Sequence, residues 1–175
     1  SMILTEHPKY NGTHKSYKSV FFVDDFILCL GSNISNVSEY ETETTLYQNN
    51  ILSGDAEPTL NSKPFNGEYI TSANDIITDN KGHCYYVKDK TKILMQQGKQ
   101  ISQSSTGSGE TSGEFAVAVI KHGISPINGS YEYGIGINGA KKKKYKILQQ
   151  DDIAHVVQFE KLTCMSIFNP QNYHK

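Results

Sequence analysis

Two short apolar runs that meet at a pair of aspartates place the strongest constraint on how this chain can fold. Residues 20–23 (Val-Phe-Phe-Val) and 26–30 (Phe-Ile-Leu-Cys-Leu) flank Asp24-Asp25. Runs of this length, rich in β-branched and aromatic residues and joined by a turn-forming pair, are typical of a β-hairpin. Because neither run alternates between apolar and polar residues, we expect much of both faces of this hairpin to be covered.

The rest of the chain continues the β pattern, with turn signals about every ten residues. Asn80-Lys81-Gly82 and Asn138-Gly139 have the composition of tight hairpin turns. No segment shows the i, i+3, i+4, i+7 apolar spacing of an amphipathic helix. The sequence therefore predicts an all-β protein, an antiparallel β-sandwich. Its expected strands, after the opening hairpin, are residues 44–52, 68–71, 75–78, 83–87, 92–95, 114–122, 131–137, 145–148, 155–159 and 163–168.

Two stretches are expected to be irregular. Residues 53–66 contain Gly54, Pro58 and Pro64 among polar residues, which predicts a long loop. Residues 96–113 form a tract of Gln, Ser, Gly and Thr, which predicts a flexible surface loop.

Charge and composition exclude several classes of function. The net charge of −1 gives no general attraction to nucleic acid or to an anionic membrane. No apolar window approaches the roughly 20 residues of a membrane span, and no signal-peptide pattern is present. All 17 basic residues are lysines. Since arginine is the residue that binds carboxylate or sulfate through two parallel hydrogen bonds, any site for an acidic ligand must use lysine, backbone amides or neutral side chains.

The candidate substrate-binding residues are one lysine run and two tyrosines. Four adjacent ammonium groups could attract an acidic polysaccharide, although a solvated hairpin tip after Asn138-Gly139 explains the same run. Tyrosines on an extended segment could stack on sugar rings, although they equally suit a half-buried strand. The predicted substrate contacts are Lys141, Lys142, Lys143, Lys144, Tyr131 and Tyr133.

No catalytic residue, metal ligand or cofactor site is predicted. Asp24-Asp25 is interpreted as a turn rather than as an acid–base pair. The six histidines have no adjacent nucleophile or orienting partner, and His155 is assigned to a strand edge. The cysteines at 29, 84 and 164 lack metal-binding spacing and are expected to be free thiols. A single disulfide between two of them is the alternative.

Several segments together resemble a known enzyme family. They are SVFFVDDFILCLGSNI at 19–34, ETTLYQ at 43–48, GHCYYV at 82–87, EFAVAVIKHG at 114–123, YEY at 131–133 and DDIAHVV at 151–157. Their order and spacing resemble polysaccharide lyase family 8, of the chondroitin sulfate ABC lyase type. The resemblance covers roughly residues 18–168 and is carried by the whole set of segments.

The resemblance implies a fold and a domain division. Enzymes of this family have an N-terminal α/α toroid, a central β-sandwich of the super-sandwich type and a smaller C-terminal β domain. We therefore expect an irregular lead-in over 1–16, in which Ser1-Met2 is a cloning scar, the central sandwich over 17–150, and an exit segment over 151–175 toward the C-terminal domain. The toroid and the C-terminal domain would be partners within one polypeptide.

The resemblance also implies a function. The family cleaves chondroitin sulfate, dermatan sulfate or hyaluronan by β-elimination, with asparagine, histidine, tyrosine and arginine on the toroid and a glutamate at the start of the β region. No segment here matches those motifs. The expectation is a non-catalytic piece of a secreted or periplasmic carbon–oxygen lyase, inactive alone, acting as scaffold and cleft wall. Two alternatives stay open, an independent carbohydrate-binding module and an adhesin-like interaction sandwich.

Overall fold

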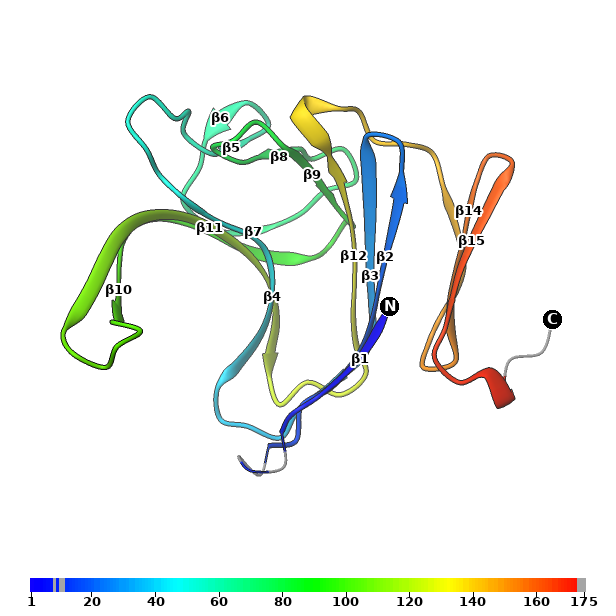
Figure 1. The fold of residues 1–175 in the computed structure, drawn as a ribbon. Coiled ribbons are helices and arrows are strands. Elements are labelled where there is room, and N and C mark those ends of the chain that lie inside the picture. Colours follow the sequence, from blue (N-terminus) through cyan, green and yellow to red (C-terminus); the bar gives the residue numbers. More distant parts are fainter. Residues whose placement is uncertain (8, 10–11, 173–175) are drawn as a thin grey trace.

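A computed structural model describes residues 1–7, 9 and 12–172, and these residues form three antiparallel β-sheets (Figure 1). Within them there is no α-helix, and the short 3-10 turns include η2 (Ile137–Gly139) and η3 (Pro170–Asn172). The prediction of an all-β antiparallel fold is confirmed.

The largest sheet, called the large sheet below, is the middle layer of the molecule. It begins at the strand nearest the N-terminus and runs through the opening hairpin to short strands at its far edge. In spatial order its strands are β1 (Met2–Thr5), β2 (Lys15–Val23), β3 (Phe26–Ser35), β12 (Gly129–Gly136), β9 (Cys84–Val87), β8 (Ile77–Thr78), β5 (Thr59–Leu60) and β6 (Lys63–Pro64).

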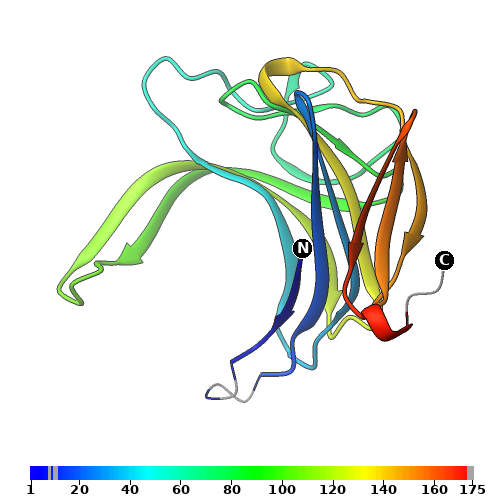
Figure 2. The same cartoon turned by 45° about the vertical axis from the view of Figure 1, so that its right-hand side comes forward.

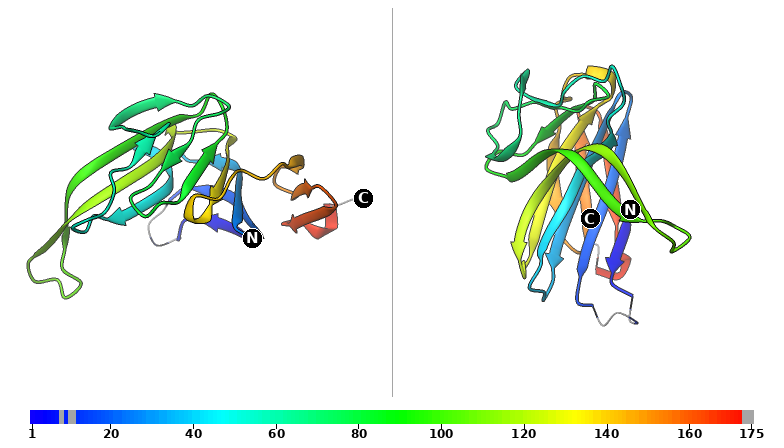
Figure 3. Two further views of the ribbon diagram at one scale, coloured as in Figure 1. Left: turned by 90° about the horizontal axis from the view of Figure 1, so that it is seen from above. Right: turned by 90° about the vertical axis from the view of Figure 1, so that its left-hand side faces the viewer.

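Two smaller sheets cover opposite faces of the large sheet (Figures 1 and 3). The first, called the arm sheet, contains β4 (Glu41–Asn50), β11 (Glu110–Ile124), β10 (Lys92–Gln103) and β7 (Gly67–Ile70). The second, called the C-terminal sheet, contains β13 (Lys146–Gln150), β14 (Ala154–Phe159) and β15 (Leu162–Ile167).

The opening hairpin is confirmed, with β2 and β3 paired from Val23–Phe26 outward. Asp24 adopts φ 53° in the turn, a left-handed conformation that aspartate tolerates better than most side chains. β3 is covered on both faces because it belongs to the middle layer. β2 differs from the expectation, since Val20 and Phe22 are 44% and 73% exposed on one of its faces.

The inner seam, between the large sheet and the arm sheet, holds the larger apolar core. Alternate residues of the paired strands point into it, as the two-residue period of a strand requires. Its buried members are Cys29, Ile34, Leu46, Tyr47, Leu60, Ile77, Tyr85, Val87, Ile93, Met95, Ala116, Ala118, Ile120, Tyr131 and Tyr133.

The outer seam, between the large sheet and the C-terminal sheet, holds a second apolar cluster. The opposite faces of β2, β3 and β9 contribute to it, and β14 packs against them. Its buried members are Phe21, Phe26, Leu28, Leu30, Tyr86, Val157 and Phe159.

The flexible loop predicted over residues 96–113 is wrong for most of its length. β10 and β11 stay paired from Ile93–Ile120 out to Gln103–Glu110, so they project from the sandwich as a two-stranded arm (Figure 2). Only the turn at residues 104–109 is irregular, with Gly107 and Gly109 at positive φ. The prediction failed because both faces of this arm are largely solvated, so its strands need no apolar alternation.

Two other expectations about irregular segments need correction. The lead-in over 1–16 contains β1, whose Met2 pairs with Lys18 of β2. The loop over 53–66 contains β5 and β6, which pair through Thr59–Pro64. These strands are too short or too polar to show a periodic signal. The C-terminal sheet spans the expected boundary between residues 150 and 151, and the division into domains stays a prediction.

Candidate functional site

The predicted lysine run lies in the linker of residues 137–145, which joins β12 of the large sheet to β13 of the C-terminal sheet. The linker begins with η2 and turns back on itself, so that the carbonyl oxygen of Ala140 comes very close to Gly136. A Cβ at position 136 would collide with that oxygen, and only glycine permits this approach. Asn138-Gly139 therefore starts a crossing between sheets instead of the expected hairpin.

Two tyrosines attach the linker to the large sheet. The hydroxyl of Tyr86 donates a hydrogen bond to the carbonyl of Ala140 over 2.9 Å. The hydroxyl of Tyr145 donates to the carboxylate of Glu132 over 2.9 Å. Burial raises the pKa of Tyr145 above its ordinary value, and the charge of Glu132 raises it further, so Tyr145 stays a donor at neutral pH.

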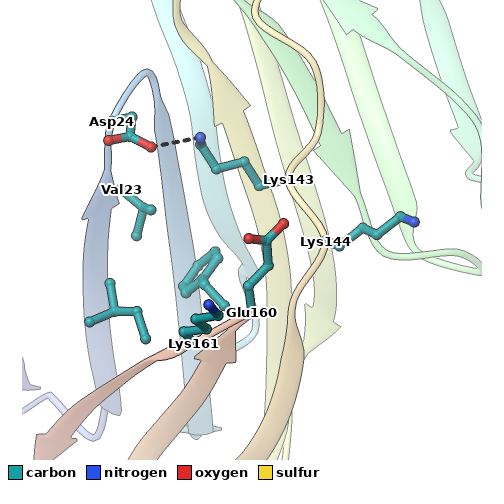
Figure 4. A pocket seen from close by; sticks show the side chains of 8 residues that line it. Val23, Asp24, Lys143, Lys144, Glu160 and Lys161 are labelled. Carbon is teal, nitrogen blue, oxygen red and sulfur yellow. Dashed lines mark hydrogen bonds and ion pairs between the residues drawn. The ribbon is translucent and has the colours of Figure 1, made fainter.

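One of the four lysines is neutralised by the turn of the opening hairpin. Nζ of Lys143 lies 2.8 Å from Oδ2 of Asp24 and 3.6 Å from Oδ1 of Asp25. Figure 4 shows the side chains of Asp24 and Lys143 pointing toward each other. The hydrogen bond with Asp24 raises the pKa of Lys143. The aspartate pair thus forms the predicted turn and also holds the linker.

A cavity of about 330 Å³, called the lysine cavity below, opens beside this ion pair, at the exposed end of the outer seam. The turn between β14 and β15 completes it, because Glu160 at φ 42° and Lys161 bring two further charges there. Its lining carries three lysines against two carboxylates, a weakly cationic balance. The lining residues are Val23, Asp24, Lys143, Lys144, Phe159, Glu160, Lys161 and Leu162.

Of the other lysines of the run, Lys144 lines this cavity, and Lys141 and Lys142 do not. Lys141 and Lys142 are exposed, and Nζ of Lys142 lies 5.6 Å from the centre of the Tyr145 ring. Figure 4 shows Lys144 pointing away from the ion pair. Lys142, Lys143 and Lys144 also line a neighbouring hollow of about 490 Å³ that contains Glu132. Lys143 and Lys144 therefore lie between the two hollows, whereas Lys141 lines neither.

The structure also separates the predicted tyrosines from the lysines. Tyr131 and Tyr133 are only 6% and 8% exposed, inside the inner seam. Their rings lie 5.6 Å apart, and Tyr131 lies directly over Gly31, where a Cβ would collide with it. Their prediction as sugar-stacking residues is corrected, because each ring face is covered by the arm sheet.

The prediction placed His155 at a strand edge, but the residue is fully buried in the outer seam. Its Nδ1 lies 2.6 Å from Oγ of Ser19 and its Nε2 lies 2.9 Å from Oγ of Ser32. Ser32 donates to the carbonyl of Asp151, so it accepts from His155, and Ser19 donates to the other ring nitrogen. Burial lowers the pKa of His155 to about 4. With no path for a substrate, this group holds two sheets together.

The most enclosed carboxylate, Asp79, is also structural. It accepts hydrogen bonds from the Tyr85 hydroxyl at 3.1 Å, from the Asn49 amide at 3.0 Å, and from two backbone amides of its own turn at 2.9 Å. Four donors satisfy a buried carboxylate without a cation.

The cysteines, possible metal ligands and helices of the described residues form no second site. Among the described residues, no three His, Cys, Asp or Glu side chains gather as they would around a metal ion. Cys29, Cys84 and Cys164 are free thiols, as predicted. No described helix is long and apolar enough to cross a membrane.

No local sequence pattern indicates that the β14–β15 turn contributes to the lysine cavity. Glu160-Lys161 separates two predicted strands, which suggests a tight turn. Its position next to the β2–β3 turn follows only from the packing of the C-terminal sheet on the large sheet.

Comparisons with known proteins agree with the resemblance. Residues 2–146 match the model of the super-sandwich domain of polysaccharide lyase family 8. A chondroitin sulfate ABC exolyase of Bacteroides thetaiotaomicron is 36% identical over 166 residues, which cover 90% of this chain and 16% of that enzyme. The exolyase of Proteus vulgaris is 33% identical over 175 residues, covering 93% and 17%. The chain thus spans a small part of these relatives.

A solved structure with the same fold comes from chondroitinase AC lyase, determined in complexes with oligosaccharides. It superposes with a TM-score of 0.73 at 22% identity, over 88% of this chain and 25% of that chain. At this identity the likeness shows the fold of the β region alone.

Proposed function

Because this chain belongs to polysaccharide lyase family 8 and contains its super-sandwich domain, we propose that it serves in an enzyme that cleaves chondroitin-type glycosaminoglycans by β-elimination. The observation that carries the proposal is the match of residues 2–146 to that domain. The substrate class is suggested by two relatives above 30% identity, both chondroitin sulfate ABC exolyases. The family resemblance carried by the segments between residues 18 and 168 is confirmed.

Within such an enzyme, this domain is a scaffold and does not carry the chemistry. β-Elimination needs a group that neutralises the uronate carboxylate, a base for the C5 proton and an acid for the departing oxygen. The chain has no arginine, and the buried His155 and Asp79 are satisfied by structural hydrogen bonds. Its partners are the remaining domains of the parent polypeptide, an α/α toroid and a C-terminal β domain.

The lysine cavity supplies the domain's contact with an acidic chain. Lys144 and Lys161 line this cavity, and within the described residues neither forms an ion pair. Two ammonium groups at the rim of an open hollow attract sulfate or carboxylate in a salt-dependent way. Lys143 contributes less, because Asp24 already compensates its charge.

The catalytic part of the proposal is tested with a chimera. The super-sandwich segment of the Bacteroides exolyase is replaced by this chain, and unsaturated uronate released from chondroitin sulfate is followed by ultraviolet absorbance. We expect product from the chimera, and none from the isolated chain or from the exolyase lacking this segment. Product from the isolated chain would refute a scaffold role. A folded chimera that leaves chondroitin sulfate, dermatan sulfate and hyaluronan intact would refute the lyase assignment.

The cavity contact is tested by binding a chondroitin 4-sulfate hexasaccharide to the isolated chain. Lys144→Met and Lys161→Met should each weaken binding, and added salt should remove the part of the binding that these lysines supply. Lys63→Met, which removes an exposed lysine of β6, is the matched control and should leave binding unchanged. Equal binding by all three variants would rule out the cavity.

We further propose that the parent enzyme is exported, to the periplasm or the medium, since a polymeric glycosaminoglycan is too large to diffuse into a cell. Cell fractionation of the native host, with lyase activity as readout, tests this. Activity confined to the cytoplasm would refute it.

A further inference from the structure

The outer face of the arm sheet, turned away from the core, carries an unusual group of side chains where the arm leaves the sandwich. Strand register decides which residues share this face, because directly paired residues project to the same side. Gln96 pairs with Val117, which pairs with Gln48. In the next rows, Gly98 pairs with Phe115, and Gln100 pairs with Gly113.

Phe115 lies at the centre of this group, and the glycines beside it keep its ring uncovered. Its direct partner on β10 is Gly98, which presents no side chain, and its direct partner on β4 is the exposed Asn50. Gly113 lies two residues earlier on the same face, and a Cβ there would lie only 2.9 Å from Cε2 of Phe115. The ring therefore leans over Gly113 and lies along the strand, where only glycine leaves it room. The result is a half-buried aromatic platform on a sheet face.

Two hollows meet at this platform, and both are framed by amides and hydroxyls. Phe115 and Gln100 line both of them. One, of about 390 Å³, adds Gln48, Ser102 and Thr111, and the other, of about 290 Å³, adds Asn66 and Gln96. Nε2 of Gln48 donates to Oε1 of Gln100 over 2.7 Å, which holds the two amides across the strands.

The chemistry of this surface selects among ligands. Lys99 is the one ionisable residue lining either hollow, so the site does not recognise an ion by charge. Apolar surface adjoins these polar groups, because the exposed Ile101 also lines the hollow that Gln48 and Thr111 line. Side-chain amides both donate and accept hydrogen bonds, as sugar hydroxyls do, and an aromatic ring matches the apolar C–H face of a pyranose.

We propose that this face, centred on Phe115 and framed by Gln48, Gln96 and Gln100, is a binding site for the pyranose rings of a polysaccharide, read through their hydroxyls and C–H faces rather than their charges. The site rests on the proposed function in that the enzyme's polymer is its ligand. It is distinct from the lysine cavity, because it lies on the arm sheet and that cavity lies at the mouth of the outer seam.

The experiment titrates the isotope-labelled chain with an unsulfated chondroitin hexasaccharide and follows backbone and glutamine side-chain amides by NMR. We expect shifts at residues 48, 96, 100 and 113–117 that persist at high salt. Phe115→Ala should weaken binding about fivefold or more, whereas Phe115→Tyr should retain it. Ile70→Ala, which removes a 65% exposed side chain from the same sheet face, is the matched control and should bind like the wild type.

The outcomes separate this site from the proposed function. Wild-type affinity in Phe115→Ala, shifts confined to residues 141–144, or no shift at all would overturn the site while leaving the lyase assignment intact. Retained hexasaccharide binding in a protein whose chimera fails to cleave would leave the site standing without that assignment. If Phe115→Ala disturbs the arm, Gln100→Ala decides, with weakened binding expected and unchanged binding contradicting the site.

Discussion

The inner and outer seams cover opposite faces of the same two strands, β3 and β12. They share one kind of contact and differ in another. In each seam an aromatic ring lies on a glycine of the neighbouring strand, Tyr131 on Gly31 in the inner seam and Phe26 on Gly134 in the outer seam. The outer seam adds a buried histidine bonded to serines from the large sheet.

This difference teaches how each pair of sheets is held together. The inner seam depends mainly on shape, since its fifteen-residue cluster is apolar or tyrosine, although Asp79 also accepts a hydrogen bond from Asn49 of the arm sheet. The outer seam has a smaller apolar cluster, and a polar contact fixes the position of the C-terminal sheet. We therefore expect packing mutations to affect both seams, and we expect His155 to make the outer seam sensitive to acid.

The largest expected loss of stability comes from removing a large side chain from the outer seam. Phe26 is fully buried, and Phe26→Ala should lower the free energy of unfolding by about 3–5 kcal/mol, because it leaves a cavity between two sheets. Urea denaturation measures this. Phe22→Ala, on the same hairpin but 73% exposed, is the matched control and should stay within about 0.5 kcal/mol of the wild type. Equal losses in both variants would contradict the layered arrangement.

The second effect is a loss of stability in acid that depends on His155. Burial lowers its folded-state pKa to about 4 from an ordinary 6.5, so the neutral ring favours folding. That contribution is complete above pH 6.5 and is lost as the pH falls toward 4, by roughly 3 kcal/mol. Unfolding of the wild type and of His155→Gln is compared across this range. The variant should lack this extra loss, and parallel pH curves would refute the assignment.

The third prediction compares the contact between an aromatic ring and a glycine in the two seams. Gly31→Ala and Gly134→Ala each place a methyl group against a buried ring, and each should cost about 1–3 kcal/mol through overpacking. Thermal unfolding checks both variants. Replacing each ring with leucine, in the double variants Gly31→Ala/Tyr131→Leu and Gly134→Ala/Phe26→Leu, should recover part of the stability that each glycine substitution loses. Additive losses would show that the clash is not with the ring.

The smallest effect should come from the ion pair at the mouth of the outer seam. Lys143→Met removes the contact with Asp24, but the side chains there are solvated, and water screens such pairs. The melting temperature should barely change, and the acid sensitivity of the wild type should remain. A loss as large as that of Phe26→Ala would mean that the surface, rather than the interior, holds the C-terminal sheet.

Local composition was enough to predict most strands and the opening turn. The run from Phe26 to Leu30 lacks polar residues because β3 lies in the middle layer, and this signature is visible in a single segment. The two paired strands of the arm were not predicted, for the opposite reason. Its strands are paired by backbone hydrogen bonds with solvent on both faces, so their side chains carry no period.

The candidate site was predicted less well. The lysine run was correctly singled out as a charged segment, but its ion pair joins residues 119 positions apart in the chain, which no local pattern reveals. Tyr131 and Tyr133 were correctly placed on one strand face, yet alternation alone does not say whether that face meets solvent or another sheet. The Phe115 platform had no apparent signal, because its residues come from three strands and become neighbours only through register.

Residue types and short periods thus established an all-β chain, its main turns and, through its resemblance, its family, because strand formation and turn chemistry are local. Which faces are covered, which charges are compensated and which aromatic ring is left open depended on how three sheets stack and on which strands pair. Those contacts join residues far apart in the chain. Their energies depend on burial and shape complementarity, which exist only after the sheets have assembled.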